Sequence, residues 1–141
     1  MAIRAVSFDL FDTLVDLLTE KLPTQEHRGR SLPTMLLRLH AMIEEKAPVD
    51  LDEYLRVMKE VDGEFRQSHY EKSRELPSIV RFQALVDRLG IESPGFADAL
   101  VAAHMEGLYA QVRFLDHHRA VLLELKKDFR LAVCSLSLIH I

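Results

Sequence analysis

Two short apolar runs, one near each end of the chain, constrain the fold more than any other feature of the sequence. The first run covers residues 3–8 and is interrupted only by Arg4 and Ser7, and the second is FRLAVCS, Phe129–Ser135. Such runs are typical of the strands of a buried parallel sheet. Strands that are joined through a helical connection lie parallel and end at the same edge of their sheet. The sequence therefore predicts an α/β fold.

Five segments between these runs carry apolar residues three and four positions apart, which is the spacing of an amphipathic helix. They are Met35–Ile43, Leu51–Phe65, Ile79–Leu89, Phe96–Leu108 and His118–Leu125. The polar stretch Pro23–Pro33, which holds Gly29 between two arginines, is typical of a linker. We predict a core formed by residues 1–15 and 114–135, with a helical bundle inserted over residues 16–113.

Composition excludes several classes of protein. The chain has 141 residues, of which 48% are hydrophobic, so it is long enough to bury a core. A net charge of −4 lacks the basic excess of a nucleic-acid binder. The single cysteine, Cys134, cannot build a disulfide framework, and no apolar run approaches the ~20 residues that cross a bilayer. We expect a cytoplasmic protein that binds neither nucleic acid nor a membrane.

An aspartate, Asp9, directly follows the first predicted strand. A carboxylate at a strand end has a fixed backbone, and it can attack a phosphorus or carbon atom in line to form a covalent intermediate that water hydrolyses. Ser135 leaves the second strand at the same predicted edge. The structural alternatives are an aspartate that caps the following turn and a serine that is buried in a strand.

The stretch from Phe8 to Asp16, FDLFDTLVD, resembles the first motif of the haloacid dehalogenase-like (HAD) superfamily. FRLAVCS, after a helix that ends in Lys126 and Lys127, is similar to the second motif of that family, a strand ending in Ser or Thr. The helical insertion resembles the family's first-type cap. The resemblance covers residues 1–135 and implies a HAD-like Rossmannoid parallel sheet core, here truncated, with an inserted α-helical cap. The third motif, a lysine, and the fourth, an acidic pair, would lie beyond the end of this chain.

The resemblance also implies a chemistry. Asp9 would be the nucleophile that forms an aspartyl-phosphate, and the Ser135 hydroxyl would bind a phosphate oxygen. Mg²⁺ would be held by the Asp9 carboxylate, by the main-chain carbonyl of Phe11 and by a further acid that this sequence lacks. Backbone N–H groups in the turn after Asp9 would add an anion nest. The expected activity is Mg²⁺-dependent hydrolysis of a small phosphate ester.

One departure from the family pattern leaves two alternatives open. Phosphatases of the family usually carry a second aspartate two residues after the nucleophile, as a general acid and base. This sequence has Phe11 there, and Asp12 is displaced by one position. Dehalogenase members carry an aromatic residue at this place, so a metal-free 2-haloacid dehalogenase is one alternative. Arg28 and Arg30 are candidates for its halide site, although a solvated loop explains them better. A non-catalytic binding module is the other alternative.

Three further features have structural explanations. The adjacent His117 and His118 are better explained by a helix-start surface than by a metal site, because adjacent side chains point in different directions. We expect Cys134 to be a small core residue. Arg74 and Arg81 are candidates for reaching a substrate phosphate, although surface pairing with Glu71 or Glu75 is the favoured interpretation.

The last residues of the chain, Leu136–Ile141 (LSLIHI), are the translation of CTG-TCT-CTT-ATA-CAC-ATC. This is the transposase end sequence that is ligated to DNA fragments in common sequencing libraries. We therefore interpret residues 136–141 as a library scar and expect the natural protein to continue differently after Ser135. The chain as given is then expected to be an inactive N-terminal fragment. The alternative is a genuine apolar continuation of the strand.

Overall fold

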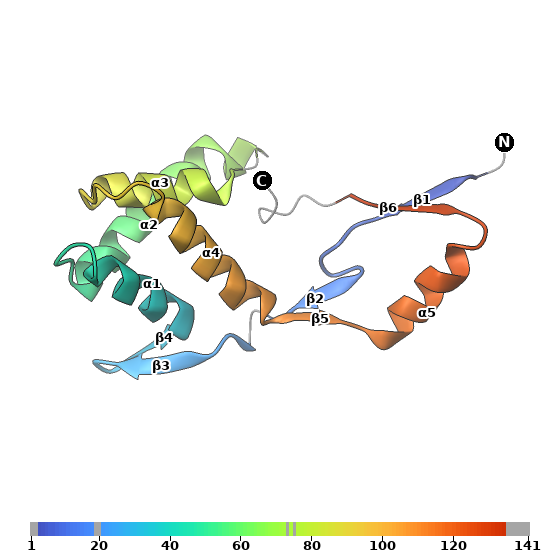
Figure 1. The fold of residues 1–141 in the computed structure, drawn as a ribbon, viewed down its shortest axis with the longest axis horizontal. Helices are drawn as coiled ribbons and strands as arrows, with labels where there is room; N and C mark the ends of the chain where they lie inside the picture. The colour runs from blue at the N-terminus through green and yellow to red at the C-terminus, as the bar shows by residue number, and fades with distance from the viewer. Residues whose placement is uncertain (1–2, 19–20, 73, 75, 135–141) are drawn as a thin grey trace. The chain divides into compact units, whose positions relative to one another are not determined.

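The computed structural model describes residues 3–18, 21–72, 74 and 76–134. These residues form five α-helices and three two-stranded sheets, so the protein is of mixed α/β class (Figure 1). Contacts divide the chain into two compact units. Unit 1 contains the described residues up to Lys21 and from Leu108 onward, and unit 2 contains Leu22–Gly107.

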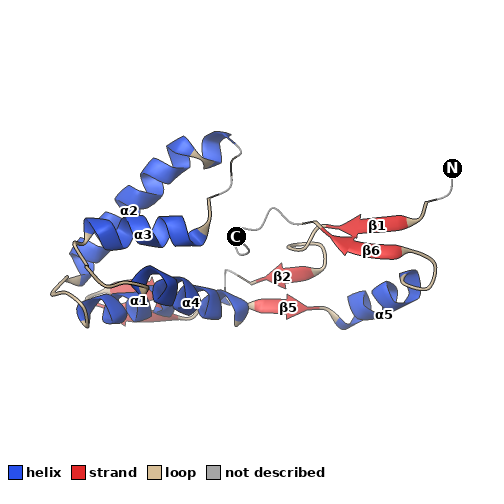
Figure 2. Cartoon of the chain, turned by 45° about the horizontal axis from the view of Figure 1, so that its top comes forward, coloured by secondary structure: helices blue, strands red, loops and turns tan. Residues whose placement is uncertain are grey.

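Strands β1 (Ala5–Phe8) and β6 (Arg130–Val133) of unit 1 pair in parallel. Ala5 lies opposite Arg130 and Phe8 opposite Val133, and the two arrows run in the same direction in Figure 2. The predicted parallel pairing of the two apolar runs is thus confirmed. Within the described residues the sheet has only these two strands, and no extended Rossmann-like sheet is present.

A second pair in unit 1 was not expected from the sequence. Strands β2 (Val15–Leu17) and β5 (Val112–Phe114) are antiparallel, and Asp16 accepts a hydrogen bond from the Arg113 guanidinium across the pair at 2.6 Å. Three residues are too few to produce a recognisable alternation of apolar and polar side chains. Because β2 precedes unit 2 and β5 follows it, the chain leaves unit 1 and returns to it through neighbouring strands.

The apolar surfaces of unit 1 are largely bare in the described part of the chain. Helix α5 (Asp116–Leu125) joins β5 to β6 and has no buried residue, and its Val121 and Leu123 are 54% and 58% exposed. Every residue of β1 and β6 is exposed or half-buried. The prediction that both strands are buried is therefore wrong for the described structure, in which Val6, Phe8 and Leu131 are half-buried and the other residues of the two strands are exposed.

Unit 2 holds the hydrophobic core. Its helices are α1 (Thr34–Glu44), α2 (Leu51–Ser68), α3 (Ser78–Arg88) and α4 (Phe96–Tyr109), with a short 3-10 helix, η2 (Tyr70–Lys72), after α2. All four helices were predicted from their apolar spacing. The fully buried side chains come from each of these helices: Leu39, Ile43, Tyr54, Val61, Phe82, Leu85 and Leu100. Among the described helices, none combines the length and hydropathy that a bilayer span requires.

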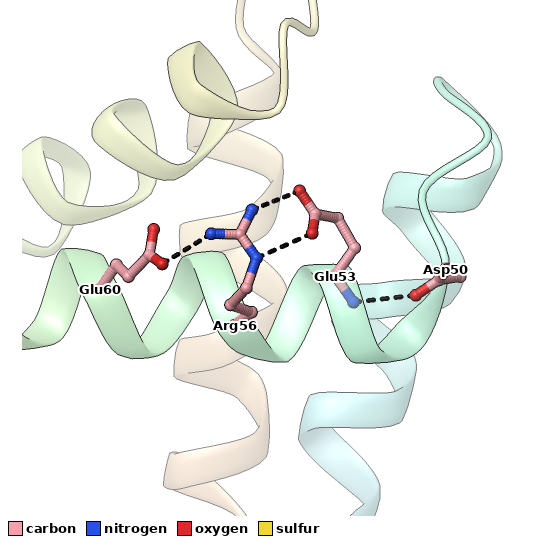
Figure 3. A network of polar contacts seen from close by, with 4 residues as sticks. All are labelled: Asp50, Glu53, Arg56 and Glu60. Atoms are coloured by element: carbon pink, nitrogen blue, oxygen red, sulfur yellow. Dashed lines mark hydrogen bonds and ion pairs between the residues drawn. The ribbon is translucent and has the colours of Figure 1, made fainter.

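Helix α2 begins at a well-formed polar cap (Figure 3). Asp50 accepts a hydrogen bond from the Glu53 N–H at 2.8 Å, which satisfies one of the free amides at the helix start. Arg56 donates to both carboxylate oxygens of Glu53, at 2.6 and 2.9 Å, and to Glu60 at 2.6 Å. The hydrogen bond from Arg56 lowers the pKa of the Glu53 carboxyl. All these side chains are exposed, so the cap contributes more to stability than the ion pairs.

The stretch predicted to be a linker is instead a β-hairpin. Strands β3 (Thr24–His27) and β4 (Arg30–Pro33) pair antiparallel, with His27 opposite Arg30. The residues between them, Arg28 and Gly29, have φ angles of 50° and 74°. Two successive left-handed residues match the twist of a hairpin, but the sequence signal for this turn is usually Asn-Gly or Asp-Gly. The sequence did not predict the hairpin, because Arg28 stands where Asn or Asp is usual and both strands are polar.

Candidate functional site

Asp9 is the first residue after β1, and its side chain is exposed. One carboxylate oxygen, Oδ1, accepts a hydrogen bond from the N–H of Leu10 at 2.8 Å. The other oxygen accepts no hydrogen bond from any residue that the structure describes. Asp9 thus combines a backbone fixed by the strand with a carboxylate that a ligand can approach.

The end of β6 lies beside the end of β1. The N–H of Cys134, the first residue after β6, donates to the Phe8 carbonyl at 2.8 Å, so the parallel pairing continues to the residue before Asp9. Cys134 is exposed, which corrects the expectation of a core residue. Ser135 and the suspected scar, residues 136–141, lie outside the described residues.

A tight turn follows Asp9 and is closed by hydrogen bonds to the carbonyl of Leu10. The Leu10 carbonyl accepts from the N–H groups of Leu14 at 2.8 Å and Val15 at 3.0 Å, and the N–H of Asp12 donates to the Val15 carbonyl at 2.8 Å. Asp12 has a φ angle of 56°, a left-handed conformation in which aspartate is one of the better tolerated residues. Its side chain is exposed, and it forms part of the turn rather than a pair with Asp9.

The turn after Asp9 has few backbone groups that are free to bind a ligand. Of its described N–H groups, those of Phe11 and Thr13 have no hydrogen-bond partner, whereas the Leu10 N–H is already used by Asp9. An anion nest would therefore have two free donors there. The Phe11 carbonyl accepts no hydrogen bond from the described residues.

These oxygens partly fit the Mg²⁺ that the family resemblance implies. The Asp9 carboxylate and the Phe11 carbonyl are hard oxygen donors, the type that Mg²⁺ prefers, but the ion is octahedral and needs about six ligands. In the described ranges no three or more His, Cys, Asp or Glu side chains are grouped closely enough to hold a metal ion. A site built on Asp9 would thus need water, phosphate and a further acid.

Two predicted candidates, Arg28 and Arg30, lie in the hairpin of unit 2. Arg28 is in its turn, and Arg30 forms an exposed ion pair with Asp52 at 2.9 Å. Both side chains are exposed, as the favoured interpretation of a solvated loop expected, but they belong to a hairpin and not to an irregular loop.

The two adjacent histidines stand at the start of α5. Their rings are 4.3 Å apart, and the Nδ1 atom of His118 lies 3.0 Å from the carbonyl oxygen of Leu14, in the turn that follows Asp9. His117 is exposed, but His118 is half-buried. The surface interpretation is therefore incomplete for His118, and no sequence signal links it to a residue so far away along the chain.

Unit 2 contains a partly buried polar cluster that the sequence did not indicate. Arg81 donates from Nε and Nη2 to the two carboxylate oxygens of Asp62, at 2.6 and 2.9 Å, and not to the predicted Glu71. The other predicted partner, Glu75, lies outside the described residues. The hydroxyl of the fully buried Tyr54 and the Nδ1 atom of His104 have no hydrogen-bond partner among the described residues. Arg81 is thus held within the helical bundle.

Burial sets the protonation states in this cluster. It lowers the pKa of His104 to about 4, with the positive charge of Arg81 acting in the same direction and Asp62 opposing it. Burial also raises the pKa of the Tyr54 hydroxyl. Both side chains are therefore neutral near pH 7.

Comparison with known proteins found no match to this chain among models of protein families, curated proteins or solved structures.

Proposed function

We propose that the complete protein is a HAD-like hydrolase, a phosphatase that uses Asp9 as its nucleophile and acts on a small phosphate ester with the help of Mg²⁺. The observation that carries the proposal is the exposed Asp9 carboxylate at the carboxyl end of β1, beside the end of the parallel strand β6. Ligands of open α/β sheets bind at this edge. The FDLFDTLVD stretch supports the assignment to the family, as does a helical unit inserted between the two strands.

In the proposed first step a carboxylate oxygen of Asp9 attacks the phosphorus atom of the ester. A bond forms between this oxygen and phosphorus, the bond from phosphorus to the leaving oxygen breaks, and the leaving alkoxide takes a proton from water. Water then attacks the same phosphorus and releases inorganic phosphate and the free carboxylate, while its proton passes to solvent. The free N–H of Phe11 would donate to a phosphate oxygen during both attacks.

Mg²⁺ bound to the Asp9 carboxylate and the Phe11 carbonyl would reduce the repulsion between the two anions. The Ser135 hydroxyl is proposed to bind a second phosphate oxygen. Phe11 stands where related phosphatases carry their general acid, and such a group typically increases the rate ~10²–10⁴-fold. We therefore propose a slow phosphatase that prefers esters with good leaving groups.

Phe11 also favours a second candidate, a dehalogenase. Here the Asp9 carboxylate would attack the carbon that bears the halogen, the carbon–halogen bond would break, and halide would leave without needing a proton. Water would then hydrolyse the ester intermediate. The half-buried Phe11 side chain is consistent with this chemistry, which uses no metal ion.

The test uses protein expressed from the intact source locus, since residues 136–141 are interpreted as a scar. The assay is hydrolysis of p-nitrophenyl phosphate with and without Mg²⁺, and the matched variants are Asp9→Asn and Asp12→Asn. Turnover that needs Mg²⁺, is lost in Asp9→Asn and persists in Asp12→Asn would support the phosphatase. Halide release from a 2-haloacid in the presence of EDTA would instead support the dehalogenase. Absence of both activities would leave the non-catalytic binding module.

A further inference from the structure

We propose that His118 is a positioning residue that fixes the turn carrying Asp9. The proposal rests on the function proposed above, and it assigns to the start of α5 a role in that same site. Its basis is one hydrogen bond between parts of unit 1 that are far apart in the sequence. The Nδ1 atom of His118 lies 3.0 Å from the Leu14 carbonyl oxygen, across a separation of 104 residues.

The direction of this hydrogen bond follows from the acceptor. A carbonyl oxygen can only accept, so Nδ1 carries the proton and donates it. Leu14 is 9% exposed, and its carbonyl has no other hydrogen-bond donor among the described residues. A buried carbonyl without a partner is unfavourable, so the turn is most stable when His118 is present.

The ring of His118 has two aromatic neighbours. The Phe114 ring meets it edge-on at a centroid distance of 6.3 Å, and the His117 ring lies 4.3 Å away. Phe114 ends β5 and pairs with Val15, the residue after Leu14. The donor and the acceptor are thus attached to the same pair of strands, which restricts their separation.

A continuous path of bonds connects His118 to the carboxylate. The N–H of Leu14 donates to the Leu10 carbonyl at 2.8 Å, and the N–H of Leu10 donates to Asp9 Oδ1 at 2.8 Å. Loss of the bond from His118 would loosen the loop formed by residues 10–15 and allow the Asp9 carboxylate to move. Misplacement of a reacting group by about 1 Å can reduce a rate ~10²-fold.

The substitutions separate the hydrogen bond from the bulk of the ring. His118→Asn keeps an N–H donor near the position of Nδ1, His118→Gln moves the donor one carbon further out, and His118→Leu removes it. His117→Leu is the matched control, because His117 touches the His118 ring but donates no hydrogen bond to the turn.

The first readout is amide hydrogen exchange in the chain of residues 1–141, and it does not require activity. We expect the Leu and Gln variants to accelerate exchange at Leu14 and Val15 by ~10-fold or more, with Asn and His117→Leu close to wild type. The amide of Cys134, bonded to Phe8, should keep its rate in every variant. Unchanged exchange at Leu14 in the Gln variant, or an Asn variant as fast as Gln, would overturn the proposal. The comparison of Asn with Gln remains decisive if the Leu variant does not fold.

The second readout is turnover of p-nitrophenyl phosphate by the product of the intact locus. We expect kcat to fall ~10- to 100-fold in His118→Gln with KM within about twofold, and to recover in His118→Asn. If His118 had a purely structural role, its substitution would lower the amount of folded enzyme, and the kcat values of His118→Asn and His118→Gln would not differ. If the wild type shows no turnover, the proposed phosphatase function fails, while the exchange experiment still decides whether His118 fixes the turn.

Discussion

Lowering the pH from 7 to 5 is expected to weaken the folded state of unit 2 through one side chain, His104. This histidine of α4 packs against Phe82 of α3 at a ring distance of 5.3 Å, and its Nδ1 atom has no partner among the described residues. The charged groups that act on it are Arg81 of α3 and Asp62 of α2. Protonation would place a positive charge in this desolvated environment, close to the guanidinium.

The sign and size follow from the pKa of His104, which is about 4 in the folded protein against an ordinary value of 6.5. The unfolded chain binds the proton more readily, so the contribution to stability is fully present above pH 6.5 and is lost as the pH falls toward 4. A tenfold difference in proton affinity corresponds to ~1.4 kcal/mol, which gives an upper value of ~2 kcal/mol lost between pH 7 and 5. Because the ring is only partly buried, we expect a loss of about 1–2 kcal/mol.

Urea unfolding followed by far-ultraviolet circular dichroism at pH 7, 6 and 5 measures this loss. A change of this size would lower the urea midpoint by roughly 0.5–1 M. The variant His104→Leu should lose most of the pH dependence, whereas His69→Leu, at the residue after α2, should retain it. Equal midpoints for the wild type at pH 7 and 5, or an unchanged pH dependence in His104→Leu, would refute the reasoning.

Two further predictions concern the stability of the same unit and use the same unfolding measurement. Leu100→Ala should cost about 3–4 kcal/mol because the side chain is fully buried, whereas Val101→Ala, at a half-buried position, should cost clearly less; similar losses would contradict the assigned core. Asp50→Ala should cost about 1 kcal/mol through loss of the bond to the Glu53 N–H, and Asp52→Ala, which removes an exposed ion pair, less than 0.5; a reversed order would contradict the cap.

The helices of unit 2 were the most predictable part of the fold. Each has an apolar face long enough to show its period, and prolines mark the starts of α1 and α3, at Pro33 and Pro77. The parallel pairing of β1 with β6 was predictable because strands that are joined through a helical connection lie parallel. Short elements gave no such signal: β2 and β5 have three residues each, and the hairpin has polar strands and an unusual Arg-Gly turn.

The candidate site was predictable only where it is local in the sequence. The position of Asp9 at a strand end could be inferred from the preceding apolar run and the turn residues after it. The bond from His118 to Leu14 could not, because it depends on the placement of α5 beside a turn far away along the chain. The pair of Arg81 with Asp62 was not predicted either, because Asp62 lies on another helix and the local spacing favoured nearby glutamates.

The pairing of β2 with β5 has a consequence for how this architecture can vary. The N–H of Leu18 donates to the Gln111 carbonyl at 3.1 Å, so the two points where the chain departs and re-enters are within one hydrogen bond of each other. A turn of a few residues could join them directly. Unit 2 could thus be exchanged, enlarged or removed, in evolution or by engineering, without breaking the pairing of β2 with β5. The ends of these two strands are therefore a suitable place to insert another domain.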